Sequence, residues 1–217
     1  MTIALGVLVS GSGTNLQAIM DAIAARSLDA RIAVVVSNVP DATALARARS
    51  AGLAAIVVDH RSFEDRRSFD TAVVDVLVAH GVDLVVLAGF MRVLTEVLID
   101  AFAMRIVNVH PGLLPSFPGV RAQRQALDYG VAVAGCTVHF VDRGVDTGPI
   151  IAQAVVPVLE DDDEERLRLR ILAKEHQLLP LVLQWIGEGR VRVDPPIAAG
   201  ERARVRVRGV PRALGLE

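Results

Sequence analysis

The stretch IALGVLVSGSGTNL, residues 3–16, joins an apolar run to a glycine-rich loop and then to a helical pattern. The run Ile3–Val9 carries no charged residue, as is expected of a strand that is buried on both faces of a sheet. The loop Ser10–Asn15 follows, and apolar residues then recur at helical spacing over Leu16–Ala25. Strand, loop and helix in this order predict the first unit of a parallel α/β sheet.

The same alternation continues through the first half of the chain. Apolar strands are expected at 32–37, 55–58, 84–88 and 106–110, and helices at 42–51, 69–80 and 95–102. Gly52 and Gly81 stand directly after two of these helices, where glycine commonly ends a helix. Repeated units of this kind predict a doubly wound, mainly parallel, Rossmann-like sheet.

The pattern changes in the second half. After a helix at 122–129, strands at 135–141 and 149–158 are separated by so short a loop that they suit an antiparallel pair. A long helix from about 163 to 185 begins with acidic residues, which suit the positive end of a helix dipole. We expect a single domain over 1–190 and a C-terminal tail over 191–217, whose Arg-Val alternation suggests one edge strand or a loose end.

Composition narrows the class of protein. The chain has 217 residues and a formal net charge of −2, which predicts no general attraction to nucleic acid or to anionic membranes. The lone Cys136 excludes an intrachain disulfide and suits a small buried hydrophobe. Ile3–Val9 is too short to span a membrane and lacks a basic flank, so we expect no signal peptide and a cytoplasmic location. No His, Asp or Glu pair has metal-ligand spacing.

The loop after the first strand suggests a phosphate site. Two glycines let the backbone approach a ligand, and the following helix N-terminus offers N–H groups to an anion. Thr14 and Gln17 resemble a capping box. Leu16 stands where a dinucleotide fingerprint has its third glycine, and no Gly-Lys-Ser/Thr follows. A monophosphate site is our interpretation, with a plain glycine turn as the alternative.

Asn108 and His110 end the strand at 106–110. Residues two apart on a strand face the same side, so an amide donor and an imidazole point together. Such a pair can hydrogen-bond to one developing oxyanion, although a structural histidine is the alternative. His139 lies on a later strand, and the sequence leaves open whether it neighbours His110.

Three further positions have two interpretations each. Phe90 and Met91 follow a buried strand and are either core residues or walls of a slot for a flat ring. Asp146 lies in the loop between the later strands, where an acid beside glycine is usually a turn former. Glu175 falls on the apolar stripe of the long helix, so it is expected either to form an ion pair or to face a pocket and bind an amine.

Several ordered motifs together resemble the phosphoribosylglycinamide formyltransferases of purine synthesis. The resemblance runs from residue 3 to about 190. The motifs that carry it are residues 11–19 (GSGTNLQAI), 87–92 (LAGFMR), 108–119 (NVHPGLLPSFPG), 139–141 (HFV), 146–149 (DTGP) and 175–176 (EH).

The resemblance implies a role for each matching position. Asn108, His110 and Asp146 match the catalytic trio. Glu175 matches the acid that holds the glycinamide end of the substrate. The substrate phosphate and ribose site corresponds to Gly11, Ser12, Gly13, Thr14 and Asn15. The positions that contact the folate correspond to Arg66, Met91, Arg92, Val93, Leu94 and Asn108.

The resemblance also implies the reaction. The formyl group of 10-formyltetrahydrofolate, a co-substrate, passes to the amine of phosphoribosylglycinamide, and no metal is needed. Asn108 and His110, as an imidazolium, would stabilise the oxyanion, and Asp146 would keep His110 charged. The partners are then two small molecules, without nucleic acid or membrane, and a homodimer is left open.

The chain departs from the family pattern at Gly112, where a Ser is expected, at Ser116, where a Lys is frequent, and at Leu172, where some relatives have a polar phosphate contact. The phosphate could then be held by Arg168 or Lys174. Formyltetrahydrofolate hydrolases and methionyl-tRNA formyltransferases share parts of the pattern, but would need an extra domain. A non-catalytic folate or nucleotide binding module is the alternative outside enzymes.

Overall fold

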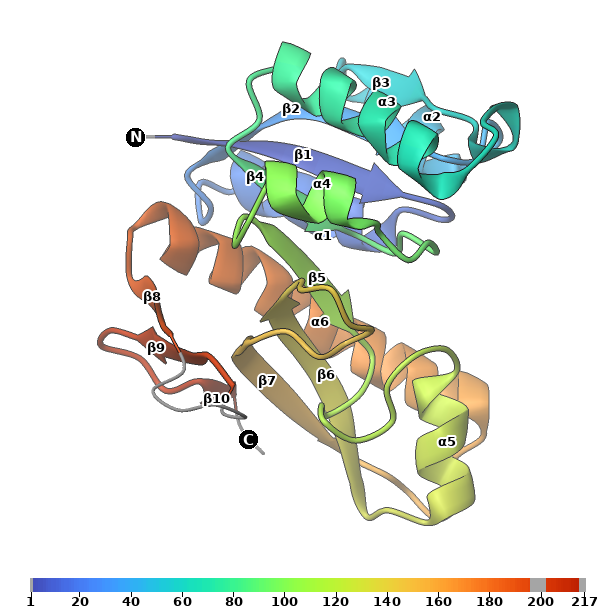
Figure 1. The fold of residues 1–217 in the computed structure, drawn as a ribbon. Coiled ribbons are helices and arrows are strands. Elements are labelled where there is room, and N and C mark those ends of the chain that lie inside the picture. The colour runs from blue at the N-terminus through green and yellow to red at the C-terminus, as the bar shows by residue number, and fades with distance from the viewer. Residues whose placement is uncertain (1, 196–201, 215–217) are drawn as a thin grey trace. The chain divides into compact units, whose positions relative to one another are not determined.

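Figure 1 shows the computed structural model of the chain, which describes residues 2–195 and 202–214. The chain divides into two compact units, Met1–Asn108 and Val109–Glu217. The boundary falls within strand β5 (Ile106–His110), so the first three residues of this strand belong to unit 1 and the last two to unit 2.

Unit 1 is built on parallel strands. Its strands are β1 (Ile3–Val9), β2 (Ala30–Ser37), β3 (Ala55–Val57), β4 (Leu84–Leu87) and the first part of β5, in the order β5-β4-β1-β2-β3. All neighbouring pairs in this order are parallel. The central strands are almost wholly buried, which explains why their sequences are continuous apolar runs.

The helices of unit 1 connect these strands. They are α1 (Thr14–Ala24), α2 (Thr43–Ser50), the short 3-10 helix η1 (His60–Ser62), α3 (Arg66–Ala79) and α4 (Glu96–Ala101). The chain first winds from β1 towards β3 and then returns to β4 and β5 on the other side of β1. Because crossovers are right-handed, this reversal puts α1 and α2 on one face and α3 and α4 on the other. Ligands of such sheets bind at the reversal point, here the carboxyl ends of β1 and β4.

Unit 2 continues with α5 (Ala122–Tyr129) and the antiparallel strands β6 (Val133–Phe140) and β7 (Ile150–Pro157). The long helix α6 (Glu164–Gly187) packs on both strands. Asp163 caps this helix by accepting a hydrogen bond from the Arg166 N–H, and two acidic residues occupy its first turn. The acidic start therefore stabilises the helix N-terminus as expected.

The C-terminal tail differs from the expected single edge strand or loose end. β8 (Val191–Asp194) and β9 (Arg204–Val207) form an antiparallel pair, and β10 (Ala213–Leu214) adds in parallel to β7. Arg212 donates from its guanidinium to the carbonyls of two β7 residues, Ile150 and Ile151. The tail thus covers an edge of the sheet. Parts of the predicted tail, 196–201 and 215–217, lie outside the described residues.

The fold class predicted from the sequence is confirmed: a doubly wound, mainly parallel sheet, antiparallel strands in the C-terminal half and a long C-terminal helix. One local prediction is wrong. The N-cap of α1 is Gly13 without a side-chain cap, so Thr14 and Gln17 form no capping box. Gln17 instead donates to Asp21 and accepts from Arg47. The single domain over 1–190 stays a prediction.

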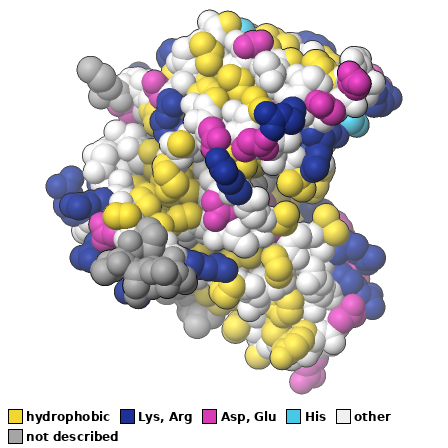
Figure 2. Space-filling model, in the orientation of Figure 1, with side chains coloured by type: hydrophobic (Ala, Val, Ile, Leu, Met, Phe, Trp, Pro, Cys, Tyr) yellow, Lys and Arg dark blue, Asp and Glu magenta, His cyan; other side chains and the backbone are white. Residues whose placement is uncertain are grey.

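The surface shows no segregation of charge on the face drawn in Figure 2, where basic and acidic side chains are interspersed. This agrees with the small net charge of −2. Within residues 2–195 and 202–214, no helix has the length and apolar character needed to cross a membrane.

Candidate active site

A cluster of titratable side chains lies in unit 2, where β5 ends. His110 Nδ1 is 3.3 Å from Asp146 Oδ2, and His139 Nε2 is 3.6 Å from Asp146 Oδ1. Both imidazoles are almost fully buried, at 3% and 2% exposure, whereas the Asp146 side chain keeps 12% of its surface exposed. One carboxylate therefore faces two buried imidazoles, and a partly open group among buried ones is suited to proton transfer.

Both ring nitrogens of His110 face oxygen atoms. Nε2 lies 2.9 Å from the Phe117 carbonyl, opposite the nitrogen that faces Asp146. Only an imidazolium can donate to both oxygens. The pKa of His110 is nevertheless lowered below its ordinary value, chiefly by burial and also by the charge of His139, against the opposing effects of the Asp146 charge and the Phe117 carbonyl. This differs from the expectation that Asp146 keeps His110 charged.

Asp146 is held in place by the loop that follows His110. The Gly119 N–H donates to Asp146 Oδ2 at 2.7 Å. Burial alone would raise the pKa of Asp146, but the contact with His139, the Gly119 N–H and the charge of His110 together lower it. Asp146 itself has a φ of 55°, a backbone conformation that is uncommon for residues other than glycine. The turn-former interpretation and the catalytic one are therefore compatible at this position.

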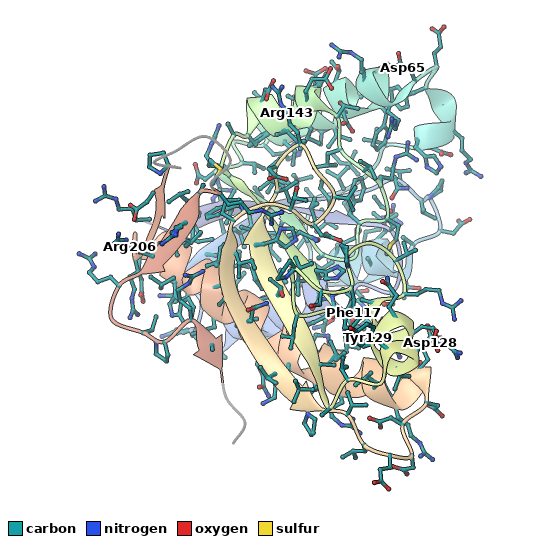
Figure 3. All side chains as sticks on the ribbon, turned by 60° about the horizontal axis from the view of Figure 1, so that its bottom comes forward. Asp65, Phe117, Asp128, Tyr129, Arg143 and Arg206 are labelled. Atoms are coloured by element: carbon teal, nitrogen blue, oxygen red, sulfur yellow. The ribbon has the colours of Figure 1, made fainter. Side chains whose placement is uncertain are left out.

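The loop from Pro111 to Gly119 is fixed from beneath by a buried hydroxyl. Thr137 Oγ1 donates to the Gly112 carbonyl and accepts from the Leu114 N–H, and Gln153 donates to both Thr137 Oγ1 and the Leu114 carbonyl. At its far end, Phe117 stacks edge-on against Tyr129 at the end of α5, as Figure 3 shows. The loop that presents a carbonyl to His110 is thus held at several points.

Gly112 explains one departure from the family pattern. A Cβ atom at this position would lie 2.9 Å from His110 Nε2 and 3.3 Å from the Ala122 Cβ. Real Cβ atoms do not approach a neighbour as closely as the first of these distances. The Ser that we expected here would require His110 or the loop to shift, so glycine and this position of the imidazole belong together.

Asn108 lies two residues before His110 on β5. The alternation of side chains along a strand places both on the same side of β5, and Asn108 is partly exposed while His110 is buried. The backbone of β5 therefore places the predicted amide donor, Asn108, and the predicted imidazole, His110, near the end of one strand.

Glu175 is buried on α6, at 6% exposure, on the stripe that carries Leu167, Ile171, Leu178 and Val182. Its charge is felt by Cys136 on β6. Burial, followed by the Glu175 charge, raises the pKa of that thiol to about 12. Cys136 is therefore an inert buried residue, as predicted. Arg168, one of the two residues suggested for the phosphate, pairs with Glu165 instead.

The glycine loop lies in unit 1 at the carboxyl end of β1. Gly13 has a φ of 72°, and a Cβ there would lie 2.6 Å from the Ala44 Cβ and 2.8 Å from the Ala44 Cα. A Cβ at Gly11 would meet no heavy atom within 4 Å, and the Gly11 carbonyl accepts from the Ala44 N–H. Arg47 donates to the Ser12 carbonyl. Contacts with α2 thus fix the loop, while Gly11 stays open to a ligand.

The segment after β4 lies at the same reversal point of unit 1. The Ser10 N–H donates to the Gly89 carbonyl, which joins the carboxyl ends of β1 and β4. Met91 and Val93 are exposed, at 71% and 53%, whereas Phe90 and Leu94 are buried. The two interpretations of this segment therefore divide between residues: Phe90 belongs to the core and Met91 faces outward. Arg66, the first residue of α3, is exposed.

Comparison with known proteins identifies the family. The family model described as "Formyl transferase" matches residues 3–183. The chain belongs to the formyl transferase family. It is 41% identical over 187 residues to the phosphoribosylglycinamide formyltransferase of Escherichia coli (strain K12), covering 86% of this chain and 88% of that protein.

Two other comparisons extend this result. The trifunctional purine biosynthetic protein adenosine-3 of Drosophila melanogaster is 45% identical over 90% of this chain, which spans only 15% of that protein's length. The crystal structure of glycinamide ribonucleotide transformylase 1 from Symbiobacterium toebii is 52% identical, with a TM-score of 0.90 over 95% of this chain and 94% of that chain.

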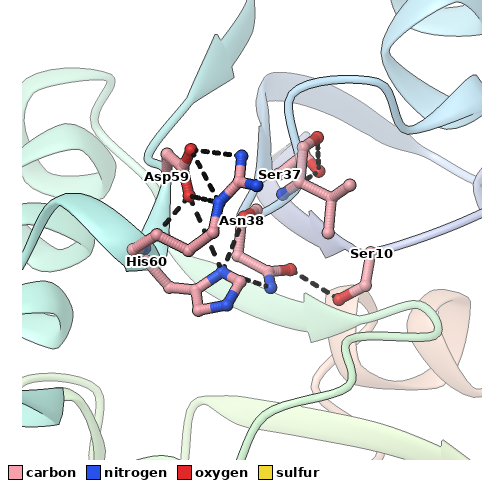
Figure 4. Close-up of polar contacts among 7 residues, drawn as sticks. Ser10, Ser37, Asn38, Asp59 and His60 are labelled. Atoms are coloured by element: carbon pink, nitrogen blue, oxygen red, sulfur yellow. Dashed lines mark hydrogen bonds and ion pairs between the residues drawn. The ribbon is translucent and has the colours of Figure 1, made fainter.

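Sequence reasoning about this formyl transferase missed several polar residues within each of the two units. The position of His139 was left open, and a register shift in β6 between Val138 and His139 makes its facing hard to predict from spacing. Ser10, Asn38, His60 and Asp70 received no role. In unit 1, the first three form contacts near the ends of strands, and Asp70 on α3 contacts Thr95 at the start of α4. Figure 4 shows three of them in one network. Among the described residues, no group of three or more His, Cys, Asp and Glu is arranged to hold a metal ion.

Proposed function

We propose that this formyl transferase moves the formyl group of 10-formyltetrahydrofolate to the amine of phosphoribosylglycinamide, giving phosphoribosyl-N-formylglycinamide and tetrahydrofolate. The observation that supports it best is the contact between Asp146 and His110, which lies at the end of β5 and two residues after Asn108. The chain that carries this contact covers 88% of the E. coli phosphoribosylglycinamide formyltransferase. The proposal includes a cytoplasmic location and only small molecules as partners. The proposed reaction requires neither a monomer nor a homodimer.

The reaction is an acyl transfer to an amine. The neutral amine attacks the formyl carbon, a C–N bond forms, and the carbonyl oxygen becomes an oxyanion. The bond to the folate nitrogen then breaks, and that nitrogen takes up a proton equivalent to the one that the amine loses. An amine is itself a good nucleophile, so the enzyme needs no Ser or Cys nucleophile. What it must supply is stabilisation of the oxyanion and a route for one proton.

Asn108 and His110 supply the hydrogen bonds to the oxyanion in this proposal. Because burial lowers the pKa of His110, its imidazole starts mostly neutral near pH 7 and gains charge as the oxyanion develops. The pKa of Asp146 is lowered, so its carboxylate stays ionised and can balance that charge. The proton from the amine then passes by way of Asp146, His110 and water to the leaving nitrogen. His110 must exchange the Phe117 carbonyl for the substrate at Nε2 in order to donate there.

We assign the binding residues for each unit separately. In unit 1, Gly11, Ser12, Gly13, Thr14 and Asn15 would bind the substrate phosphate and ribose, and Arg66, Met91, Arg92, Val93, Leu94 and Asn108 would contact the folate. The start of an eleven-residue helix, α1, supports the first assignment, because its N–H groups attract an anion. In unit 2, the buried Glu175 would bind the glycinamide amine.

A spectrophotometric assay with both substrates tests the proposal. We expect formation of tetrahydrofolate that requires phosphoribosylglycinamide. Formation of tetrahydrofolate at the same rate without the glycinamide would instead indicate a formyltetrahydrofolate hydrolase. Binding of either ligand without any turnover would indicate a binding module, and either outcome would overturn the proposed function.

A further inference from the structure

The segment Met91–Leu94 is fastened at both ends by side chains to which neither the sequence nor the proposed reaction gives a role. At its start, the Met91 N–H donates to Ser10 Oγ at 2.8 Å. At its end, Asp70 Oδ2 accepts from the Thr95 N–H at 2.6 Å and from the Thr95 hydroxyl at 2.7 Å. Only residues 92–94 lie between the two attached residues, so the backbone of the segment is held close to both hydrogen-bonded ends.

The Ser10 attachment belongs to a chain of contacts across the strand ends (Figure 4). The Ser10 hydroxyl accepts from Met91 and donates to Asn38 Oδ1 at 2.6 Å. This fixes the orientation of the Asn38 amide, whose nitrogen lies 3.3 Å from His60 Nδ1. His60 Nδ1 also lies 2.9 Å from the Asn38 carbonyl. The hydroxyl therefore joins the end of β1 to the segment after β4 and to the end of β2.

The Asp70 attachment is a buried carboxylate on a helix face that is otherwise apolar. Asp70 is 2% exposed on α3, beside the buried Phe69 and Val73. A carboxylate in such a place is costly unless hydrogen bonds stabilise it. Thr95 is the N-cap residue of α4 and forms no side-chain cap; Asp70 accepts from its N–H, which is one of the N–H groups without a partner inside the helix. The neighbouring Phe69 ring carries the Arg92 guanidinium at 4.9 Å from its centroid, so α3 holds the segment through two adjacent residues.

From these contacts we infer that Ser10 and Asp70 are positioning residues that hold Met91–Leu94 in the conformation that binds the folate co-substrate. This inference rests on the proposed function for its ligand, but the attachment itself does not. The exposed Met91 and Val93 alternate with Arg92 and Leu94, which contact the protein, so a segment fixed at both ends presents two side chains and the backbone between them to a ligand. Fixing these groups before binding lowers the entropy lost on binding.

The variants that test this are Ser10→Ala and Asp70→Ala, with Asp70→Asn as the conservative replacement. The Asn oxygen can still accept from Thr95, so Asp70→Asn should restore most of what Asp70→Ala loses. Ser37→Ala is the control for Ser10, because Ser37 ends the neighbouring strand β2 and its hydroxyl contacts the backbone of Val39. Asp65→Ala is the control for Asp70, because it removes the N-cap of the same helix.

Two measurements separate positioning from general stability. Ser10→Ala and Asp70→Ala should raise the KM for the formyl folate about three- to tenfold, the effect of one ordinary hydrogen bond, with the KM for the glycinamide within twofold. Amide hydrogen exchange should show faster exchange at Met91 in Ser10→Ala and at Thr95 in Asp70→Ala, which needs no substrate. If Asp70→Ala does not fold, Thr95→Val, which removes only the hydroxyl bond, takes its place.

Equal rises of both KM values, or similar rises in the Ser37 and Asp65 controls, would overturn the positioning role. Unchanged exchange at Met91 and Thr95 would overturn the attachment itself. A wild-type chain without turnover, but with the expected exchange changes, would refute the proposed function and leave the attachment standing.

Discussion

The Nδ1 atom of His110 lies 3.3 Å from the Asp146 carboxylate. The same carboxylate oxygen accepts the Gly119 N–H, so Asp146 both faces the imidazole and holds the loop after it. Charge and position are therefore combined in one side chain, and substitutions that remove one but not the other should have different effects.

Asp146→Asn should lower kcat by about 100-fold or more while leaving the loop in place, since an amide oxygen can still accept from Gly119 but carries no charge to balance an imidazolium. Asp146→Ala should lose the same activity and also the loop contact. Single-turnover rates report the first effect, and amide hydrogen exchange at Gly119 reports the second. Equal exchange at Gly119 in both variants would argue against the positioning part of this role.

Asn108→Ala and His110→Ala should each fold and lose most turnover, by roughly 10²–10³-fold for each lost oxyanion donor. The reason is that both side chains project from one side of β5. Steady-state kinetics and a melting curve on one preparation check this. Either variant within threefold of wild-type activity would show that the assigned roles are wrong.

The stability of the protein should depend on the protonation of His110. Its folded-state pKa lies below its ordinary value because of burial, so the unfolded chain binds the proton more readily. The folding stability that depends on a neutral imidazole is fully present above about pH 6.5, the pKa of His110 in the unfolded chain. This stability is lost as the pH falls through the folded pKa. Wild type should therefore lose stability relative to His110→Gln as the pH falls from about 7 to below the unfolded pKa of about 6.5.

Melting temperatures of both proteins across this range test the sign, with His80→Gln, at the C-cap of α3, as the histidine control. A wild type that gains stability relative to His110→Gln as pH falls would mean that the Asp146 charge outweighs burial, and His110 would then start as an imidazolium.

The sequence predicted the sheet well because buried parallel strands and glycine-ended helices leave strong local patterns. Strand Ile106–His110 and helix Ala122–Tyr129 have the bounds that the sequence indicated. The tail was harder to predict, because Val205 is buried only through pairing with β8 and packing that depends on distant residues. Thr14 and Gln17 fit a capping box locally, but Gln17 found partners in Asp21 and Arg47 instead.

The candidate site was predictable to the extent that residues share a strand. Asn108 and His110 are two apart, so their common side follows from spacing alone. The approach of Asp146 and His139 to His110 depends on how β6 and its following loop fold back, which no local pattern specifies. The lowered pKa of His110 was missed for the same reason, because desolvation depends on the whole surrounding structure.

Gly11→Val should weaken binding of the phosphorylated substrate more than that of the folate. A Cβ atom at Gly11 would meet no heavy atom within 4 Å apart from its chain neighbours, so we expect the valine to obstruct the approach of a ligand while the protein stays folded. Gly13→Val is a different case, because its Cβ would collide with the Ala44 backbone at a positive φ and should destabilise the protein. KM values for both substrates and melting temperatures separate the two variants. Equal losses for both substrates in a stable Gly11→Val would count against a phosphate site in this loop.

Glu175→Gln should raise the KM for the glycinamide and leave that for the folate nearly unchanged. The carboxylate is 6% exposed on an apolar stripe of α6, and a primary amine is a natural partner for such an acid. Glutamine keeps the size and hydrogen-bonding capacity but removes the charge, so the loss should be about 1–3 kcal/mol if a charge-assisted hydrogen bond disappears. Glu165→Gln is the matched control on the same helix, where the carboxylate is exposed and pairs with Arg168. A structural ion pair at Glu175 predicts the opposite pattern: a clear drop in melting temperature, with the glycinamide KM unchanged or both KM values raised alike. Measuring both KM values and the melting temperature on one preparation decides between substrate binding and structural support.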